Sequence, residues 1–206
     1  MRDKHEKEMK ALEKKNESLN DQVVTLNYRT KKNDSKMNEV EQYSRRNNLR
    51  IRGIKVHPKE TITDAVIRVV NSKLKLEKDS HGNTVSLSHS DIEVAHHIQP
   101  RKPPGASENK STQNNQAQSI IVRFFDRNMR DRIIRARKQL KRKPEEQGSV
   151  PITICEDLTA SNQKLLETLS SIESVSKSWS WNGKLFYTLH GVRKTHQIQL
   201  HDELPQ

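Results

Sequence analysis

The sequence is poor in the residues that build a large compact core. Apolar residues make up 31% of the 206 residues and aromatic residues only 4%, whereas a compact globular domain has about 45–50% apolar residues. The single cysteine, Cys155, excludes a disulfide framework and a cysteine zinc site within one chain. No run of about 18 apolar residues is present, so we expect no transmembrane helix. Part of the chain is therefore expected to lie outside any hydrophobic core.

Signatures of catalysis are equally scarce. Glycine totals six residues, and no glycine-rich loop of the phosphate-binding type is present. The nine histidines include no pair at metal-ligand spacing with a carboxylate, and the adjacent His96 and His97 would point to opposite faces of a strand. Cys155 has no recognisable histidine partner for nucleophilic catalysis. We therefore expect no enzymatic activity, no catalytic or metal-binding residues, no cofactor and no small-molecule substrate.

What the chain has in excess is positive charge. Lysine and arginine total 38 against 26 acidic residues, which gives a formal net charge of +12. A surplus of this size indicates a polyanionic partner, with nucleic acid favoured over an acidic membrane surface. Between Arg123 and Lys143 the chain carries ten basic residues and only two acidic ones, Asp126 and Asp131. Such a concentration is typical of the electrostatic footprint of a nucleic-acid-binding surface.

Residues 1–47 follow a seven-residue repeat that no proline or glycine interrupts. Leucine occupies three successive d positions, and charged or amide side chains fill most positions outside the seam, a pattern typical of a coiled coil. The seam residues that we expect to drive oligomerisation are Leu12, Leu19, Val23, Leu26, Met37 and Val40. The alternative is a lone amphipathic helix packed on its own domain, for which this stripe is too narrow and too long.

Two features of the repeat favour different numbers of helices. Val23 at an a position, with leucine at the d positions, favours a dimer. The segment from Lys36 to Glu41 instead has a trimer-favouring order: a basic residue, an apolar a position, two spacers, an apolar d position and a glutamate. Lys36 stands where this pattern usually has arginine. We expect a parallel homotrimer, with a homodimer as the alternative.

The periodicity changes after Asn47. The sequence predicts, in order, a strand over 49–54, a helix over 62–74 capped by Thr61 or Thr63, strands over 91–98 and 119–125, a helix capped by Asp126, and a strand over 150–155. The resulting βαββαβ order is that of ferredoxin-like domains, which include RNA recognition motifs (RRMs). We therefore place an RRM-like domain at 48–155. Its residues 99–118, rich in proline and polar residues, are expected to form a mobile loop.

The expected sheet has one cationic face. If the alternating apolar residues of 49–54 and 119–125 point into the core, Arg50, Arg52 and Arg123 point outward. The RNP1 consensus of RRMs, with its glycine and aromatic residues, is missing. We therefore expect a platform that binds phosphates and reads little sequence.

A second small domain is expected at 156–206. A helical apolar stripe is followed by Asn182-Gly183 between β-rich flanks, which is the strongest short hairpin signal. A two-residue turn would place Trp181 opposite Lys184, where the ring could stack on a base next to its phosphate. Packing of Trp181 in a core is the equally weighted alternative.

The junction from Tyr43 to Ile54, YSRRNNLRIRGI, resembles the junction between coiled coil and RRM in the first open reading frame protein of LINE-type retrotransposons, the transposase 22 family. The stretches 91–100, 120–124 and 156–159 agree with that family in order. The resemblance covers about residues 36–200. It implies a coiled-coil homotrimer in which each chain carries an RRM and a small C-terminal domain. It also implies sequence-tolerant binding of single-stranded RNA and DNA, and nucleic-acid chaperone activity.

The resemblance further implies a role in transposition, with element RNA packaged into cytoplasmic ribonucleoprotein particles. Entry into the nucleus as well is an open alternative. By motif position it assigns nucleic-acid contacts to Asn48, Arg50, Arg101 or Lys102, Arg123, Arg137 or Lys138, Lys164 and Trp181. The family has two arginines near Lys164 and often tyrosine where Trp181 stands. Relative to the family the coiled coil is short, and we expect the C-terminal domain to be truncated.

Together, charge and pattern predict an α+β protein with a coiled-coil helix at 1–47, the RRM-like domain at 48–155 and a nucleic-acid-binding domain at 156–206. Arg52 and Lys184 are also expected to contact nucleic acid, because of their predicted positions on the sheet face and beside the hairpin turn, although the family resemblance does not assign them. The alternative function is a coiled-coil scaffold whose basic patch binds acidic protein or an anionic membrane. Such a scaffold would leave single-stranded RNA unbound.

Overall fold

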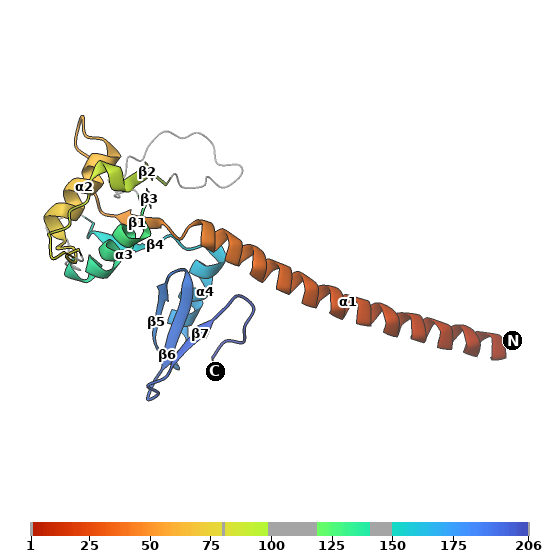
Figure 1. Ribbon diagram of the computed structural model, residues 1–206. Helices are drawn as coiled ribbons and strands as arrows, with labels where there is room; N and C mark the ends of the chain where they lie inside the picture. Colours follow the sequence, from red (N-terminus) through yellow and green to blue (C-terminus); the bar gives the residue numbers. More distant parts are fainter. Residues whose placement is uncertain (1, 80, 99–118, 141–149, 206) are drawn as a thin grey trace. The chain divides into compact units, whose positions relative to one another are not determined.

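The computed structural model describes residues 2–79, 81–98, 119–140 and 150–205 (Figure 1). The protein is of mixed α+β type, with a long N-terminal helix followed by antiparallel sheets, and this part of the fold prediction is confirmed. The expected loop at 99–118, with Arg101 and Lys102, lies outside the described residues.

The chain forms two compact units that are discontinuous in sequence. The first comprises Met1–Gln42, Thr159–Trp179 and Lys184–Gln206, and the second comprises Tyr43–Leu158 and Ser180–Gly183. The four residues at the tip of the C-terminal hairpin thus belong to the second unit.

The second unit contains a four-stranded antiparallel sheet with the strand order β2-β3-β1-β4. Its strands are β1 (Asn48–Arg52), β2 (Ile92–His97), β3 (Ile120–Phe124) and β4 (Thr153–Glu156), and its helices are α2 (Ile62–Lys73) and α3 (Arg127–Ala136). The element order β-α-β-β-α-β is the one that the sequence predicts. Strand β4 begins three residues later than expected, after Pro151, which has no N–H to donate to a ladder.

Both helices of the second unit start at side chains that cap them. The Thr61 hydroxyl accepts a hydrogen bond from the Asp64 N–H (3.1 Å), and the Asp64 carboxylate accepts one from the Thr61 N–H (3.3 Å). This reciprocal arrangement is a capping box. At the start of α3 the Asp126 carboxylate accepts from the Asn128 N–H at 3.0 Å. Both caps were among those predicted.

The core of the second unit lies on one face of its sheet. Leu49, Ile51, Ile120, Val122 and Phe124 are all 0% exposed, as the alternation in β1 and β3 predicts. They form one cluster with buried residues of α2 and α3, so both helices cover the same face. The other face of the sheet carries the polar side chains of β1 and β3.

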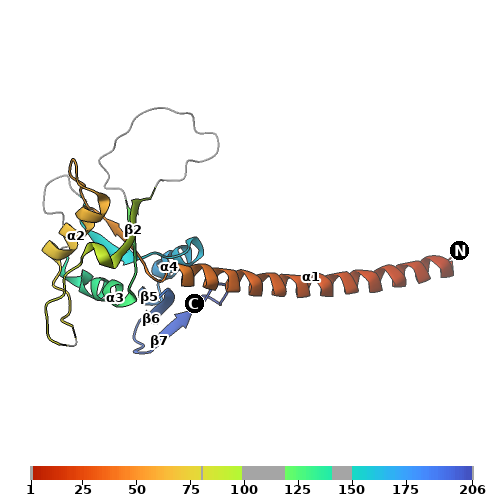
Figure 2. The same ribbon diagram turned by 45° about the horizontal axis from the view of Figure 1, so that its top comes forward.

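The first unit contains the long helix α1 (Arg2–Ser44), helix α4 (Ala160–Ser171) and a sheet of order β5-β6-β7. Figure 2 shows α1 as one continuous helix. The strands are β5 (Val175–Trp181), β6 (Lys184–Leu189) and β7 (Thr195–Ile198). The turn residues Asn182 and Gly183 have φ values of 54° and 75°, the left-handed backbone of a type I′ turn. The predicted hairpin is therefore confirmed, and Trp179 stacks on Phe186 with ring centroids 5.9 Å apart.

Strand β7 was not predicted. It has four residues, and of these only Ile198 is buried, opposite Leu185 of β6. A single apolar position does not establish a period of two, so the sequence carries little signal for this strand.

Candidate nucleic-acid interface

The outer face of the four-stranded sheet is defined by its register. In antiparallel pairs, residues directly opposite each other point to the same face. Arg50 lies between Ile121 of β3 and Cys155 of β4, and Ile121 in turn lies opposite His96 of β2. These residues therefore form one row across the outer face.

Two further rows flank the first. In one, Asn48 lies opposite Arg123, which lies opposite Val94; in the other, Arg52 lies opposite Thr153. Four of the expected contacts, Asn48, Arg50, Arg52 and Arg123, are thus brought together on one face. The side chains of Arg50 and Arg123 are 35% and 50% exposed, and Arg52 is exposed. No phenylalanine, tyrosine or tryptophan of the four strands stands in these three rows.

Two arginines of this face are paired with carboxylates. Arg50 Nη2 lies 3.0 Å from Asp157 Oδ1, and Arg123 Nε lies 2.9 Å from Glu93 Oε2. Glu93 is 39% exposed, and an exposed pair of this kind contributes only about 0–1 kcal/mol because water and salt screen it. A phosphate can therefore compete with Glu93 for Arg123 at little cost. Asp157, at 2% exposure, has a different role.

Asp157 is a buried carboxylate that accepts hydrogen bonds from side chains in and just before β1. Its Oδ1 accepts from Arg45 Nη1 (3.4 Å) and Arg50 Nη2 (3.0 Å), and its Oδ2 accepts from Asn48 Nδ2 (3.1 Å). A buried charge has to be compensated in this way, because its desolvation is costly. Arg50 Nε and Asn48 Oδ1 are buried and have no hydrogen-bond partner among the described residues.

Sequence reasoning missed the role of Asp157. The residue lies more than a hundred positions from the three side chains that it holds, and a single aspartate after a strand carries no signal for such partners. The available signal was the stretch 156–159, which the family resemblance singled out without assigning it a contact.

Cys155 adds a neutral group to the outer face. Its Sγ lies 3.6 Å from the carbonyl oxygen of Arg50. Desolvation raises the pKa of this thiol above its usual range, against the lowering effect of Arg50 and Arg137. At neutral pH the group is therefore uncharged and does not cancel the arginine charges.

The basic run from Arg123 onward, described as far as residue 140, does not place all of its charge at the surface. Arg130 is 1% exposed and forms ion pairs with Glu156 and Asp131, so its charge is neutralised inside the unit. Arg132 donates to the backbone carbonyl of Glu77 at 2.6 Å. Counting charge along a helix overstates the surface charge because it ignores which face each residue occupies.

The remaining expected contacts are spread over both units. Arg137 is half-buried and Lys138 exposed in the 3-10 turn that follows α3. Lys164 on α4 and Lys184 on β6 are exposed residues of the first unit. Trp181 is half-buried and packs against the core of the second unit, with the guanidinium of Arg135 5.8 Å from its ring centroid. The packing of Trp181 against this core agrees with the alternative in which the residue is a core tryptophan.

Metal-ligand clusters and membrane-spanning helices are absent from the described ranges. Within them, no three His, Cys, Asp or Glu side chains are grouped so as to hold a metal ion. No helix in the same ranges combines the length and apolarity that a membrane crossing needs.

Comparison with models of known protein families gave no match. A search of curated proteins also found no relative, so function has to be inferred from the site itself.

Proposed function

We propose that this chain is a sequence-tolerant protein for binding single-stranded RNA and DNA, and that it is a nucleic-acid chaperone of the LINE-type retrotransposon kind. The observation that carries the proposal is the outer face of the β2-β3-β1-β4 sheet, where Arg50, Arg52 and Arg123 stand on adjacent strands. Guanidinium groups bind phosphate oxygens in fixed geometry. Without aromatic platforms or a dense set of base-reading groups, such a face favours the backbone over the sequence.

We further propose that the second unit is a ferredoxin-like RRM. Its element order, its strand order and the placement of both helices on one face support this assignment. In RRMs the central strands carry the nucleic-acid contacts. Here the central strands are β3 and β1, and these carry the three arginines.

Self-association through α1 is part of the same proposal. The seam residues Met9, Leu12, Leu19, Val23, Leu26, Met37 and Val40 are 49–72% exposed. The contacts of α1 with the C-terminal part of its own unit come from other positions, with Ser35, Asn38 and Gln42 bonded to Leu200, Asn162 and Thr159 respectively. A lone amphipathic helix would bury its apolar stripe on its own domain. The exposed stripe therefore favours a homotrimer or a homodimer.

Replacing Arg52 and Arg123 together by alanine is expected to weaken binding to all single strands alike. Removing one phosphate contact should reduce the slope of log K against log salt by about 0.7. Fluorescence anisotropy on oligonucleotides of different sequence, over a range of salt concentrations, measures both quantities. The matched control removes the same charge from α2, by changing Arg68 and Lys73 to alanine, and should bind nearly as the wild type does.

Two results of that titration would refute the assignment. One is a weakening confined to a single oligonucleotide sequence, which would indicate base reading. The other is wild-type protein that ignores RNA while binding acidic protein or anionic vesicles, which would indicate a scaffold.

We expect the wild-type protein to accelerate the annealing of complementary strands at low salt and to lose this effect as salt rises. Cations that bind weakly one by one screen the repulsion between two phosphate backbones and let the strands slide, and several copies on one stalk hold two strands together. Labelled complementary oligonucleotides report the rate. The Arg52→Ala/Arg123→Ala variant should anneal slowly even at saturating protein. Tight binding with an unchanged annealing rate would make the protein a passive coat protein.

A further inference from the structure

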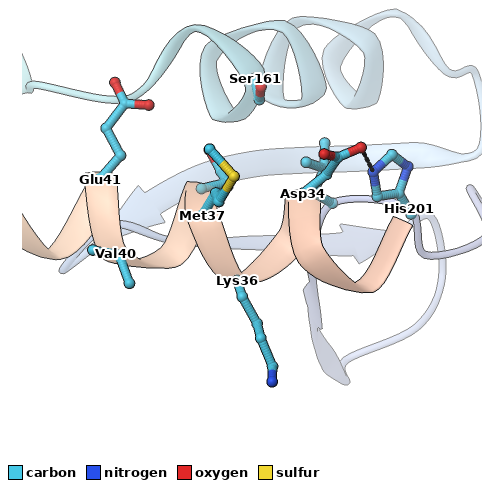
Figure 3. A pocket seen from close by; sticks show the side chains of 9 residues that line it. Asp34, Lys36, Met37, Val40, Glu41, Ser161 and His201 are labelled. Carbon is cyan, nitrogen blue, oxygen red and sulfur yellow. Dashed lines mark ion pairs between the residues drawn. The ribbon is translucent and has the colours of Figure 1, made fainter. Parts of the chain in front are cut away.

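A groove of about 750 Å³ lies beside the C-terminal end of α1 in the first unit. On the helix side it is lined by Asp34, Lys36, Met37, Asn38, Val40 and Glu41, and across from them by Ser161, Leu200 and His201. Figure 3 shows Asp34, Met37 and Glu41 on the side of α1 that faces Ser161 and His201, whereas Lys36 and Val40 point the other way.

The seven-residue repeat explains which part of α1 borders this groove. Met37 and Val40 occupy a and d positions, Asp34 and Glu41 occupy e positions, and Lys36 occupies a g position. The groove therefore runs along the e side of the seam. Beyond it, the b and f positions are already held by the C-terminal part of the unit, since Asn38 Nδ2 donates to Asn162 Oδ1 at 2.8 Å and Ser35 Oγ donates to the Leu200 carbonyl at 3.0 Å.

We propose that α1 of a second copy of this chain, parallel and in register, lies in this groove. Ser161, Leu200 and His201 then form an outer wall of the oligomer interface, so the seam of α1 is only part of the contact between subunits. This inference rests on the self-association in the proposed function. It adds that the neighbouring helix contacts the C-terminal part of the unit as well as α1.

Charge complementarity selects this occupant and its direction. In a parallel coiled coil, a g residue of one helix meets the e residue five positions later in its neighbour. The neighbour's Arg29 and Lys36 would therefore lie against Asp34 and Glu41, which pairs two cations with two carboxylates. An antiparallel neighbour would instead place e residues against e residues and g residues against g residues, which brings like charges together.

Chemical cross-linking tests the wall directly in the full chain. In a Cys155→Ser background, Lys36→Cys combined with Ser161→Cys should give covalent oligomers with a short bis-maleimide reagent. A cross-link within one chain leaves the mass on a denaturing gel unchanged, so the readout reports neighbours only. The matched control pairs Ser161→Cys with Lys15→Cys, another g position that lies roughly 30 Å further along the helix. It should give few or no covalent oligomers.

Charge exchange provides a second test that does not depend on cysteine geometry. Glu41→Lys and Lys36→Glu should each shift the mass measured by light scattering toward the monomer. The double variant, which restores the pair with its signs exchanged, should return to the wild-type mass.

Failure of this inference is distinguishable from failure of the proposed function. If the wild type is an oligomer but the Lys36→Cys/Ser161→Cys chain cross-links no more than the control, the helix does not occupy the groove and self-association through the seam stands. If light scattering gives a monomer, both the groove occupant and the proposed self-association are wrong.

Discussion

Changing Leu19 and Leu26 to aspartate is expected to convert the oligomer to monomers and to weaken binding to a long single strand by roughly 10²- to 10⁴-fold. Both leucines are exposed d positions of α1, at 49% and 57% exposure. A charge at a packed seam position would have to be buried without a partner, which a coiled coil does not tolerate. Once the subunits separate, each binds the strand alone, and the gain from linked sites disappears.

The same helix offers a matched control for this experiment. Val24 and Tyr28 are also exposed apolar residues, at 62% and 65%, but they occupy b and f positions outside the seam. Val24→Asp combined with Tyr28→Asp makes the same change in charge, with a smaller helix-propensity penalty because valine and tyrosine are weaker helix formers than leucine. It should leave both mass and affinity close to wild type. Monomers in this control, or an intact oligomer after the seam change, would contradict the assigned seam.

Arg130→Ala is expected to lower the free energy of unfolding of the second unit by about 3–5 kcal/mol, because it leaves the Glu156 carboxylate buried without its ion-pair partner. The two side chains are 1% and 2% exposed. The Gly183 N–H also donates to the Glu156 carboxylate, at the long distance of 3.5 Å. Urea unfolding followed by circular dichroism measures the change.

Two companion variants make the Arg130 result interpretable. Arg127→Ala removes an arginine from the same helix, but one that is 44% exposed and 4.0 Å from Asp131, so it should change stability by about 0.5 kcal/mol or less. Combining Arg130→Met with Glu156→Leu removes both charges and should recover much of the stability. An Arg130→Ala chain that unfolds like the wild type would show that the pair does not stabilise the unit.

The parts of the fold that were predictable are those set by neighbouring residues. The Thr61 and Asp126 caps, the Asn182-Gly183 turn and the alternation in β1 and β3 depend on residues a few positions apart. Their physics is local, so a single sequence carries it. The same holds for the outward direction of Arg50 and Arg123, which follows from the buried positions beside them.

The parts that were not predictable depend on contacts between distant segments. Asp157 holds Arg45, Asn48 and Arg50 from the far end of the second unit, and Arg130 is buried by Glu156, 26 positions away. Nothing in the type of these residues distinguishes a phosphate-binding arginine from one enclosed by its own unit. The basic run therefore overstates the number of cations available on the second unit. The position of the cationic outer face of the β2-β3-β1-β4 sheet was predictable, but the number of its free charges was not.

In the proposed oligomer, α1 contacts both its own unit and the neighbouring subunits, and this restricts how its length can change. Positions Ser35, Asn38 and Gln42 are bound by the C-terminal part of the unit, while the upstream seam is free to meet other subunits. Successive residues of a helix are about 100° apart in rotation. One residue inserted before Asp34 would therefore turn the upstream seam by about 100° away from Met37 and Val40, whereas seven would shift it by only about 20°. Chains of this kind can thus lengthen or shorten their stalk in steps of whole heptads, and other insertions put its two ends out of phase.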